Sequence, residues 1–104
     1  MTDEDLTLIV GRVRASFDAT AIYLFGSQAK GSAKSGSDID LLVVGPSRLP
    51  QGRRGREVVV ALATFPSHFD VLFYTEAELD EACADPHSFM SSVMVSARLL
   101  YSAS

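Results

Sequence analysis

Two aspartates stand one residue apart at the start of an apolar run, in the sequence Ser-Asp-Ile-Asp-Leu-Leu-Val-Val. Aspartate is unusual in a strand, so the pair needs a chemical reason. If the run is a strand, Asp38 and Asp40 point to the same face, with Cα atoms about 6.5–7 Å apart. Two carboxylates arranged in this way can bind Mg²⁺, which fills its remaining octahedral positions with water and substrate phosphate.

A third carboxylate occurs in a similar setting further along the chain. Asp70 is the only acid in the apolar run at 69–75 and lies near the start of that run. If the strands at 38–44 and 69–75 are parallel neighbours, Asp70 falls beside the first two aspartates. Three carboxylates around two metal ions suit an in-line displacement at phosphorus.

The glycine- and serine-rich segment at 26–37 could supply the phosphate-binding side of such a site. Gly26 would let the backbone approach a ligand closely, and Ser27 offers a hydroxyl group where a helix is expected to begin. Lys30 and Lys34 add positive charge nearby.

Each of these features also has a simpler interpretation. Gly-Ser is a common turn pair, Asp38 could cap a turn, and Asp70 could be a solvated acid at a strand edge. The combination and its spacing are what indicate a catalytic site.

Hydrophobic periodicity and turn residues predict the elements that position these groups. The expected elements are a helix at 3–18, strands at 21–25 and 38–44, a crossover helix at 57–65, a strand at 69–75 and two further helices. Thr75 and Glu78 form a capping box that opens the helix at 76–84. Asp85-Pro86 signals the start of the last helix, whose stripe contains Phe89, Val93, Ala97 and Tyr101. This stripe is expected to lie in the core, or in part at an interface. The fold class predicted is α/β (α+β), with three strands in a single domain over residues 1–104.

Composition excludes several classes of protein. The net charge of −4 argues against general nucleic-acid binding, although four arginines gather between residues 48 and 56. The single cysteine, Cys83, excludes an internal disulfide and suits a reducing compartment. The N-terminus is acidic, unlike a signal peptide, and no apolar run reaches the ~18 residues of a membrane helix. We therefore expect a cytoplasmic protein without a membrane partner.

Several other polar residues are interpreted as structural at this stage. His68 and His87 are expected at the surface, and Cys83 is expected to be a small packed residue. The arginines Arg53, Arg54 and Arg56 are interpreted as a solvated loop, although an acidic partner or a nucleotide could use them.

The spacing Gly26-Ser27, ten residues, Asp38-Ile39-Asp40, followed by Asp70, resembles the nucleotidyltransferase superfamily typified by DNA polymerase β. The short chain looks like the minimal nucleotidyltransferases that partner HEPN-domain proteins. The resemblance covers nearly the whole chain and implies a polymerase β-like core, a small mixed sheet with flanking helices.

The resemblance also implies roles for individual residues. Asp38, Asp40 and Asp70 would be catalytic and would bind Mg²⁺, with two ions expected. Gly26, Ser27, Lys30 and Ser37 would bind the nucleoside triphosphate, ATP. Relatives often have arginine where this chain has Lys30. Lysine keeps the positive charge but cannot make the bidentate contact of arginine.

Three functions are compatible with the resemblance. The first is transfer of a nucleoside monophosphate, AMP from ATP, to a hydroxyl of a cognate HEPN toxin, with the protein acting as an antitoxin. The second is a non-catalytic antitoxin that neutralises its HEPN partner by direct contact. The third is transfer to a small molecule such as an aminoglycoside, which ranks lowest because an acceptor-binding domain is missing. The acceptor and the oligomeric state stay open.

Overall fold

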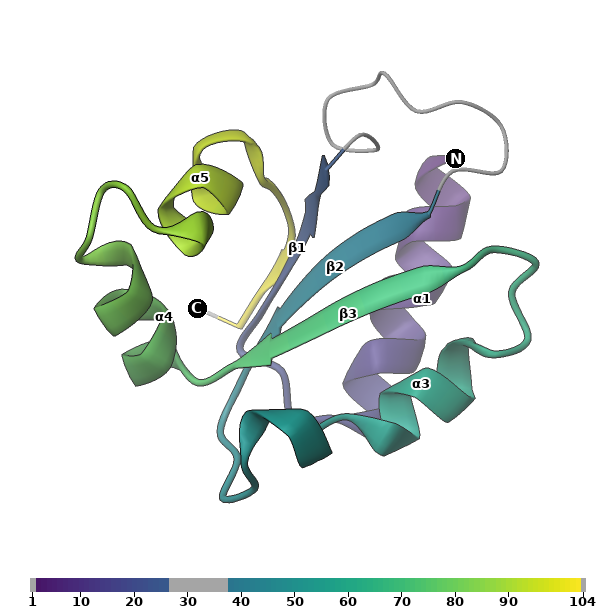
Figure 1. The fold of residues 1–104 in the computed structure, drawn as a ribbon. Helices are drawn as coiled ribbons and strands as arrows, with labels where there is room; N and C mark the ends of the chain where they lie inside the picture. The colour runs from purple at the N-terminus through teal and green to yellow at the C-terminus, as the bar shows by residue number, and fades with distance from the viewer. Residues whose placement is uncertain (1, 27–37, 104) are drawn as a thin grey trace.

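The computed structural model of the protein describes residues 2–26 and 38–103. They contain a four-stranded mixed sheet with the order β3-β2-β1-β4 (Figure 1). The strands are β1 (Ala21–Phe25), β2 (Ile39–Val44), β3 (Phe69–Tyr74) and β4 (Arg98–Ser102). The helices are α1 (Asp3–Ser16), α3 (Arg56–Leu62), α4 (Glu76–Cys83) and α5 (Phe89–Ser96), with a 3-10 turn, η1, at Gln51–Arg53. The predicted α/β class with a small mixed sheet and flanking helices is therefore confirmed.

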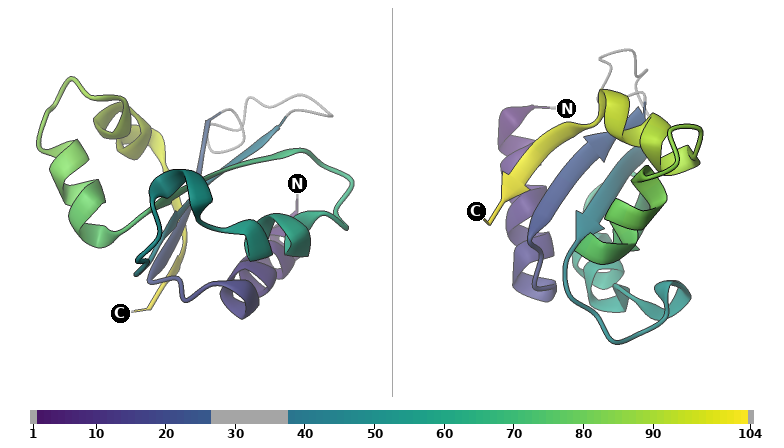
Figure 2. Two further views of the ribbon diagram at one scale, coloured as in Figure 1. Left: turned by 60° about the horizontal axis from the view of Figure 1, so that its bottom comes forward. Right: turned by 90° about the vertical axis from the view of Figure 1, so that its left-hand side faces the viewer.

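Helices cover both faces of the sheet (Figure 2). On one face, α1 and α3 pack over a core that includes Ile9, Val13 and Val58. On the other face, α4 and α5 contribute to a smaller core that includes Met90 and Val93. Strand β2 is buried by both layers, which explains why its sequence after Asp40 is continuously apolar.

The pairing of the strands fixes the position of the aspartates. Strand β2 pairs with β3 in parallel, so that Asp40 lies directly opposite Asp70. Strand β1 pairs with β2 in the antiparallel sense, which brings Phe25 opposite Asp40 and places the end of β1 beside the start of β2. The expectation that the second and third strands are parallel neighbours is confirmed.

Local capping signals explain where two of the helices begin. Thr2 and Asp5 form a reciprocal capping box at the start of α1. Thr75 and Glu78 form the predicted box at the start of α4. In each box a side-chain oxygen satisfies a backbone N–H that the first helical turn leaves unpaired.

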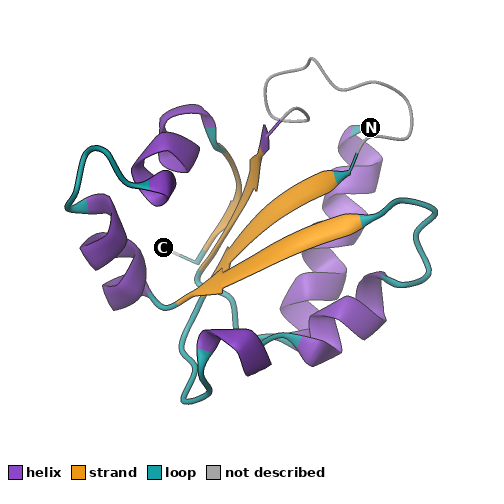
Figure 3. Cartoon of the chain, viewed as in Figure 1, coloured by secondary structure: helices purple, strands orange, loops and turns teal. Residues whose placement is uncertain are grey.

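The predicted last helix is wrong at both ends (Figure 3). Asp85 forms a turn in which its carboxylate accepts the backbone N–H of His87 at 2.9 Å, and Ser88 provides the N-cap of α5 instead. The helix stops at Ser96, so that Tyr101 lies on β4 and not on a helical stripe with Phe89. Phe89 is largely exposed, contrary to its expected place in the core.

The fourth strand was missed because its stabilising contacts are not local. Arg98–Ser102 pairs with β1, with Tyr101 opposite Ile22. Without this pairing β1 would be an edge strand with unpaired backbone groups. The Arg14 guanidinium also lies 4.2 Å from the centre of the Tyr101 ring, which links α1 to β4.

Within residues 2–26 and 38–103, every helix is too short or too polar to span a lipid bilayer.

Candidate active site

Four polar side chains gather where β2 and β3 begin. Asp40 and Asp70 are register partners, and the alternation of each strand places them on the same face as Leu42 and Leu72, which pack toward α4 and α5. Asp38 and His68 lie two residues before Asp40 and Asp70, respectively. Between them the backbone N–H of Ile39 donates to the carbonyl oxygen of His68 at 2.9 Å. The ladder of the parallel pair therefore sets the spacing of the whole group.

Asp40 differs from its neighbours in burial and in acidity. It is partly buried, whereas Asp38 and Asp70 are exposed. Burial raises the pKa of the Asp40 carboxyl group, and the negative charges of Asp70 and Asp38 raise it further. The negative charges of the three carboxylates therefore lie close together at this end of the sheet.

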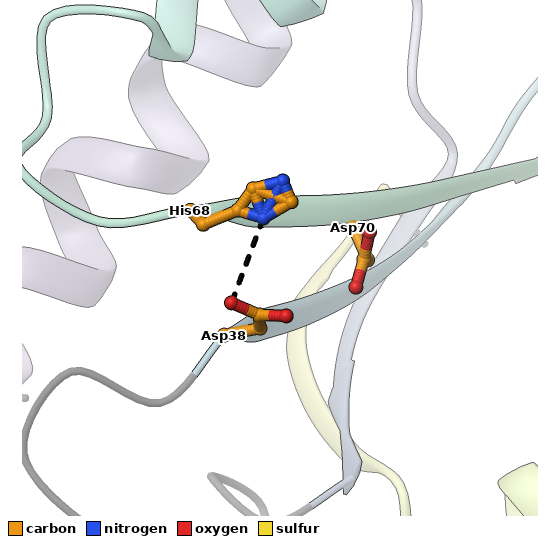
Figure 4. Close-up of side chains that lie close together, drawn as sticks. All are labelled: Asp38, His68 and Asp70. Atoms are coloured by element: carbon orange, nitrogen blue, oxygen red, sulfur yellow. Dashed lines mark ion pairs between the residues drawn. The ribbon is translucent and has the colours of Figure 1, made fainter.

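His68 lies within this group and is exposed, as expected, although the sequence did not assign it to the site. Its Nδ1 is 3.5 Å from Oδ1 of Asp38 (Figure 4). Ligand atoms of Asp38, His68 and Asp70 all lie within 4.8 Å of one another. The signal that could have revealed it is simple alternation, because His68 precedes Asp70 by two residues, as Asp38 precedes Asp40.

Gly26 follows the last residue of β1 and lies beside the Asp40 carboxylate. Its φ is +73°, a conformation that L-residues with a side chain rarely adopt. A Cβ atom added here would lie 2.3 Å from Oδ2 of Asp40. Glycine is therefore required both by the turn and by the close approach of this carboxylate. The other predicted nucleotide-binding residues, Ser27, Lys30 and Ser37, and also Lys34, lie outside the described residues.

Arg54 is not part of a solvated loop, so that interpretation is wrong for this residue. Its side chain is only 6% exposed and forms a bidentate ion pair with Glu78, at 2.5 and 3.0 Å. The guanidinium group also donates to the carbonyl oxygens of Leu49 and Phe73. Hydrogen bonding to Arg54, together with the Thr75 N–H, lowers the pKa of Glu78 to about 2.

This ion pair lies at the far end of β2 and β3 from the aspartates. It attaches the loop after β2 to the start of α4. We therefore assign Arg54 a structural role, whereas Arg53 and Arg56 are exposed, as expected.

The donor set of the site fits a divalent cation. Carboxylate oxygens are the ligands that Mg²⁺ and Mn²⁺ favour. A cation would also neutralise the charges that raise the pKa of Asp40. Asp38, His68 and Asp70 present ligand atoms close enough together to hold it, and Asp40 lies beside them as the register partner of Asp70.

Residues 6–97 match the family described as "Nucleotidyltransferase domain". The match spans most of the chain, so the protein belongs to this nucleotidyltransferase family. No curated protein matches the sequence.

Solved structures share the fold. A toxin-antitoxin complex with AMP-PNP matches with a TM-score of 0.67 and 21% identity, over 95% of this chain and 74% of that chain. A Sulfolobus solfataricus protein assigned as a nucleotidyltransferase matches with a TM-score of 0.63 and 26% identity, over 94% and 80%. A mutant of the toxin-antitoxin complex MntA-HpeT, in which two aspartates are replaced by glutamate, matches with a TM-score of 0.62 and 18% identity, over 99% and 75%. The nucleotidyltransferase family and its fold, both implied by the resemblance, are confirmed.

Proposed function

We propose that this protein is a Mg²⁺-dependent nucleotidyltransferase that moves AMP from ATP onto a hydroxyl of a cognate HEPN toxin, and thereby acts as a cytoplasmic antitoxin. Residues 1–104 would form one minimal nucleotidyltransferase domain. The observation that carries the proposal is the register of Asp40 opposite Asp70, with Asp38 on the same face and Gly26 against the Asp40 carboxylate.

The likeness to toxin-antitoxin structures supports the biological setting. One of these structures contains AMP-PNP, an analogue of ATP. The MntA-HpeT mutant replaces two aspartates one residue apart, the spacing of Asp38 and Asp40 in this chain. These facts belong to the related proteins, and they indicate which nucleotide and which kind of partner to test here.

Asp38, Asp40 and Asp70 would hold two Mg²⁺ ions. When bound, these ions neutralise the phosphate charge and align the attacking and leaving oxygens. Gly26, Ser27, Lys30 and Ser37 would hold the triphosphate. The acceptor hydroxyl oxygen forms a bond to the α-phosphorus as the bond from that phosphorus to the β-phosphate oxygen breaks, which releases pyrophosphate. The exposed Asp70 carboxylate would accept the proton of the hydroxyl group.

The exposure of the site supports a macromolecular acceptor. Asp38, His68 and Asp70 are all exposed, and no described element closes over them. An open site of this kind gains its acceptor specificity from the surface of a second protein. This favours a protein hydroxyl over a small molecule such as an aminoglycoside.

Label transfer tests the reaction class. The protein, Mg²⁺ and a HEPN toxin encoded beside it are incubated with ATP labelled at either the α- or the γ-phosphate. We expect label on the toxin from α-labelled ATP only, because the transferred group is the nucleoside monophosphate. Label from γ-labelled ATP would indicate a kinase and would contradict the proposal.

A further inference from the structure

We propose that His68 is a direct ligand of the metal centre, so that the site prefers Mn²⁺ to Mg²⁺ more strongly than an all-carboxylate site would. This inference rests on the proposed function, because it concerns the metal that the same aspartates would hold. It adds a ligand, and with it a metal preference, that the three aspartates do not supply.

The position of His68 is set by the sheet and not by a loose loop. The backbone N–H of Ile39 donates to the carbonyl oxygen of His68 at 2.9 Å, which extends the parallel ladder one residue beyond β3. His68 therefore faces Asp38 in the same way that Asp70 faces Asp40. The imidazole ring points toward the two carboxylates in Figure 4.

The spacing of the donor atoms suits a shared ion. Metal–ligand distances of 2.0–2.1 Å place adjacent ligands of an octahedron roughly 2.9 Å apart and opposite ones roughly 4.2 Å apart. Nδ1 of His68 lies 3.5 Å from Oδ1 of Asp38, and the ligand atoms of Asp38, His68 and Asp70 lie within 4.8 Å of one another. These separations exceed the octahedral values, so rotation of the exposed side chains would bring the three donors onto one cation.

A purely structural role explains His68 less well. The side chains of His68 and Asp38 are 66% and 53% exposed, and an ion pair so exposed contributes little to folding. Their 3.5 Å separation is also longer than a good hydrogen bond.

The chemistry of imidazole determines which metal benefits. Mg²⁺ favours oxygen donors, whereas imidazole nitrogen binds the transition metals well. The addition of one imidazole to a carboxylate site therefore strengthens Mn²⁺ binding more than Mg²⁺ binding.

Electron spin-echo spectroscopy of bound Mn²⁺ tests the ligand directly, because a coordinated imidazole nitrogen couples to the manganese electron spin. The chain has two histidines, so one substitution assigns the signal. We expect nitrogen coupling in the wild-type full-length protein, its loss in His68→Asn, and its retention in the matched control His87→Asn, which lies in the turn before α5. Wild-type protein that binds Mn²⁺ without nitrogen coupling would overturn the proposal.

Metal titrations provide a second readout. His68→Asn should weaken Mn²⁺ binding by about tenfold or more, as expected for a disturbed ligand set, and should weaken Mg²⁺ binding less. An unchanged ratio of Mn²⁺ to Mg²⁺ affinity would contradict the role of His68, yet the proposed function would stand if label transfer still occurred. Wild-type protein that binds neither ion in the presence of ATP would instead overturn the proposed function, and this inference with it.

Discussion

Asp40 on β2 and Asp70 on β3 lie directly opposite each other in a parallel pair of strands. Burial raises the pKa of Asp40, and repulsion by the carboxylates of Asp70 and Asp38 raises it further. A protein selected only for stability would gain from a neutral residue at one of these positions. The cation proposed above would offset this repulsion and would account for the register.

We predict that Asp40→Asn stabilises the metal-free protein at neutral pH. Because the folded state raises the pKa of Asp40, it binds the proton more tightly than the unfolded state does, so wild-type stability falls as pH rises from about 3.9 through the raised value. The gain should stay below about 1 kcal/mol, because solvent screens a partly exposed charge. Thermal unfolding in EDTA between pH 4 and pH 8 measures it.

Addition of Mg²⁺ should make the wild type more stable than Asp40→Asn. Ions raise the melting temperature of the wild type, because only its folded state presents the aspartates together, and should raise that of Asp40→Asn less. Asp80→Asn, an exposed position on α4, serves as the control and should follow the wild type. A wild type that is as stable as Asp40→Asn in EDTA at pH 8 would contradict the electrostatic account.

We predict that Gly26→Ala lowers stability by about 1–2 kcal/mol, the cost of a left-handed conformation, and also displaces the Asp40 carboxylate. The added Cβ would lie 2.3 Å from Oδ2 of Asp40 but 3.5 Å from Cβ of that residue. Truncation of Asp40 to alanine should therefore relieve part of the cost. Denaturant unfolding of the two single variants and the double variant measures this coupling, expected to be at least about 0.5 kcal/mol.

Gly11→Ala is the matched control for this prediction. Gly11 lies within α1, and a Cβ added there would meet no atom within 4 Å. This substitution should stabilise the protein by roughly 0.5–1 kcal/mol, because alanine loses less entropy than glycine in a helix. An equal cost of Gly26→Ala with and without the Asp40 side chain would show that the contact with the carboxylate has no role.

We predict that Glu78→Gln removes part of the acid sensitivity of the fold. Pairing with Arg54 lowers the pKa of Glu78 to about 2, so its contribution is present above the unfolded value of about 4.5 and is lost as pH falls toward 2. The variant lacks this contribution, so its stability should change less over that range, and it should be less stable than the wild type above pH 5. Chemical denaturation from pH 2 to pH 6 tests the prediction.

Glu81→Gln is the control, because Glu81 is an exposed glutamate of the same helix, α4. It should retain the wild-type slope of stability against pH. If Glu78→Gln and Glu81→Gln gave the same slope of stability against pH, the ion pair between Glu78 and Arg54 would have no part in the acid sensitivity of the fold.

The features that the sequence could predict depend on local signals. Alternation in a strand was enough to place Asp38 and Asp40 on one face, and the box of Thr75 and Glu78 was enough to start α4. The position of Asp70 needed one further assumption, that its strand is the parallel neighbour of β2.

The features that were missed depend on contacts between distant residues. Strand β4 is stabilised by its pairing with β1, and its five residues carry no local signal of that pairing. The Arg54 side chain is shielded from solvent by its ion pair with Glu78, a residue 24 positions away in the chain. Asp85 and Ser88 are both residues that can cap a helix. Ser88 is the N-cap of α5, because its side chain accepts the backbone N–H of Ser91.

The double variant Asp38→Asn/Asp40→Asn tests most directly whether the aspartates act by catalysis. The side chains keep their size but lose the charges that would hold Mg²⁺, so the surface offered to a partner hardly changes. We expect wild-type protein and the control Asp18→Asn/Asp80→Asn, at two exposed positions, to transfer label from α-labelled ATP to the toxin and to neutralise it. The double variant should do neither, with transfer reduced by more than ~10²–10³-fold. Full neutralisation by the double variant, with no label transferred by any of the proteins, would contradict catalysis and show that the protein acts by direct contact.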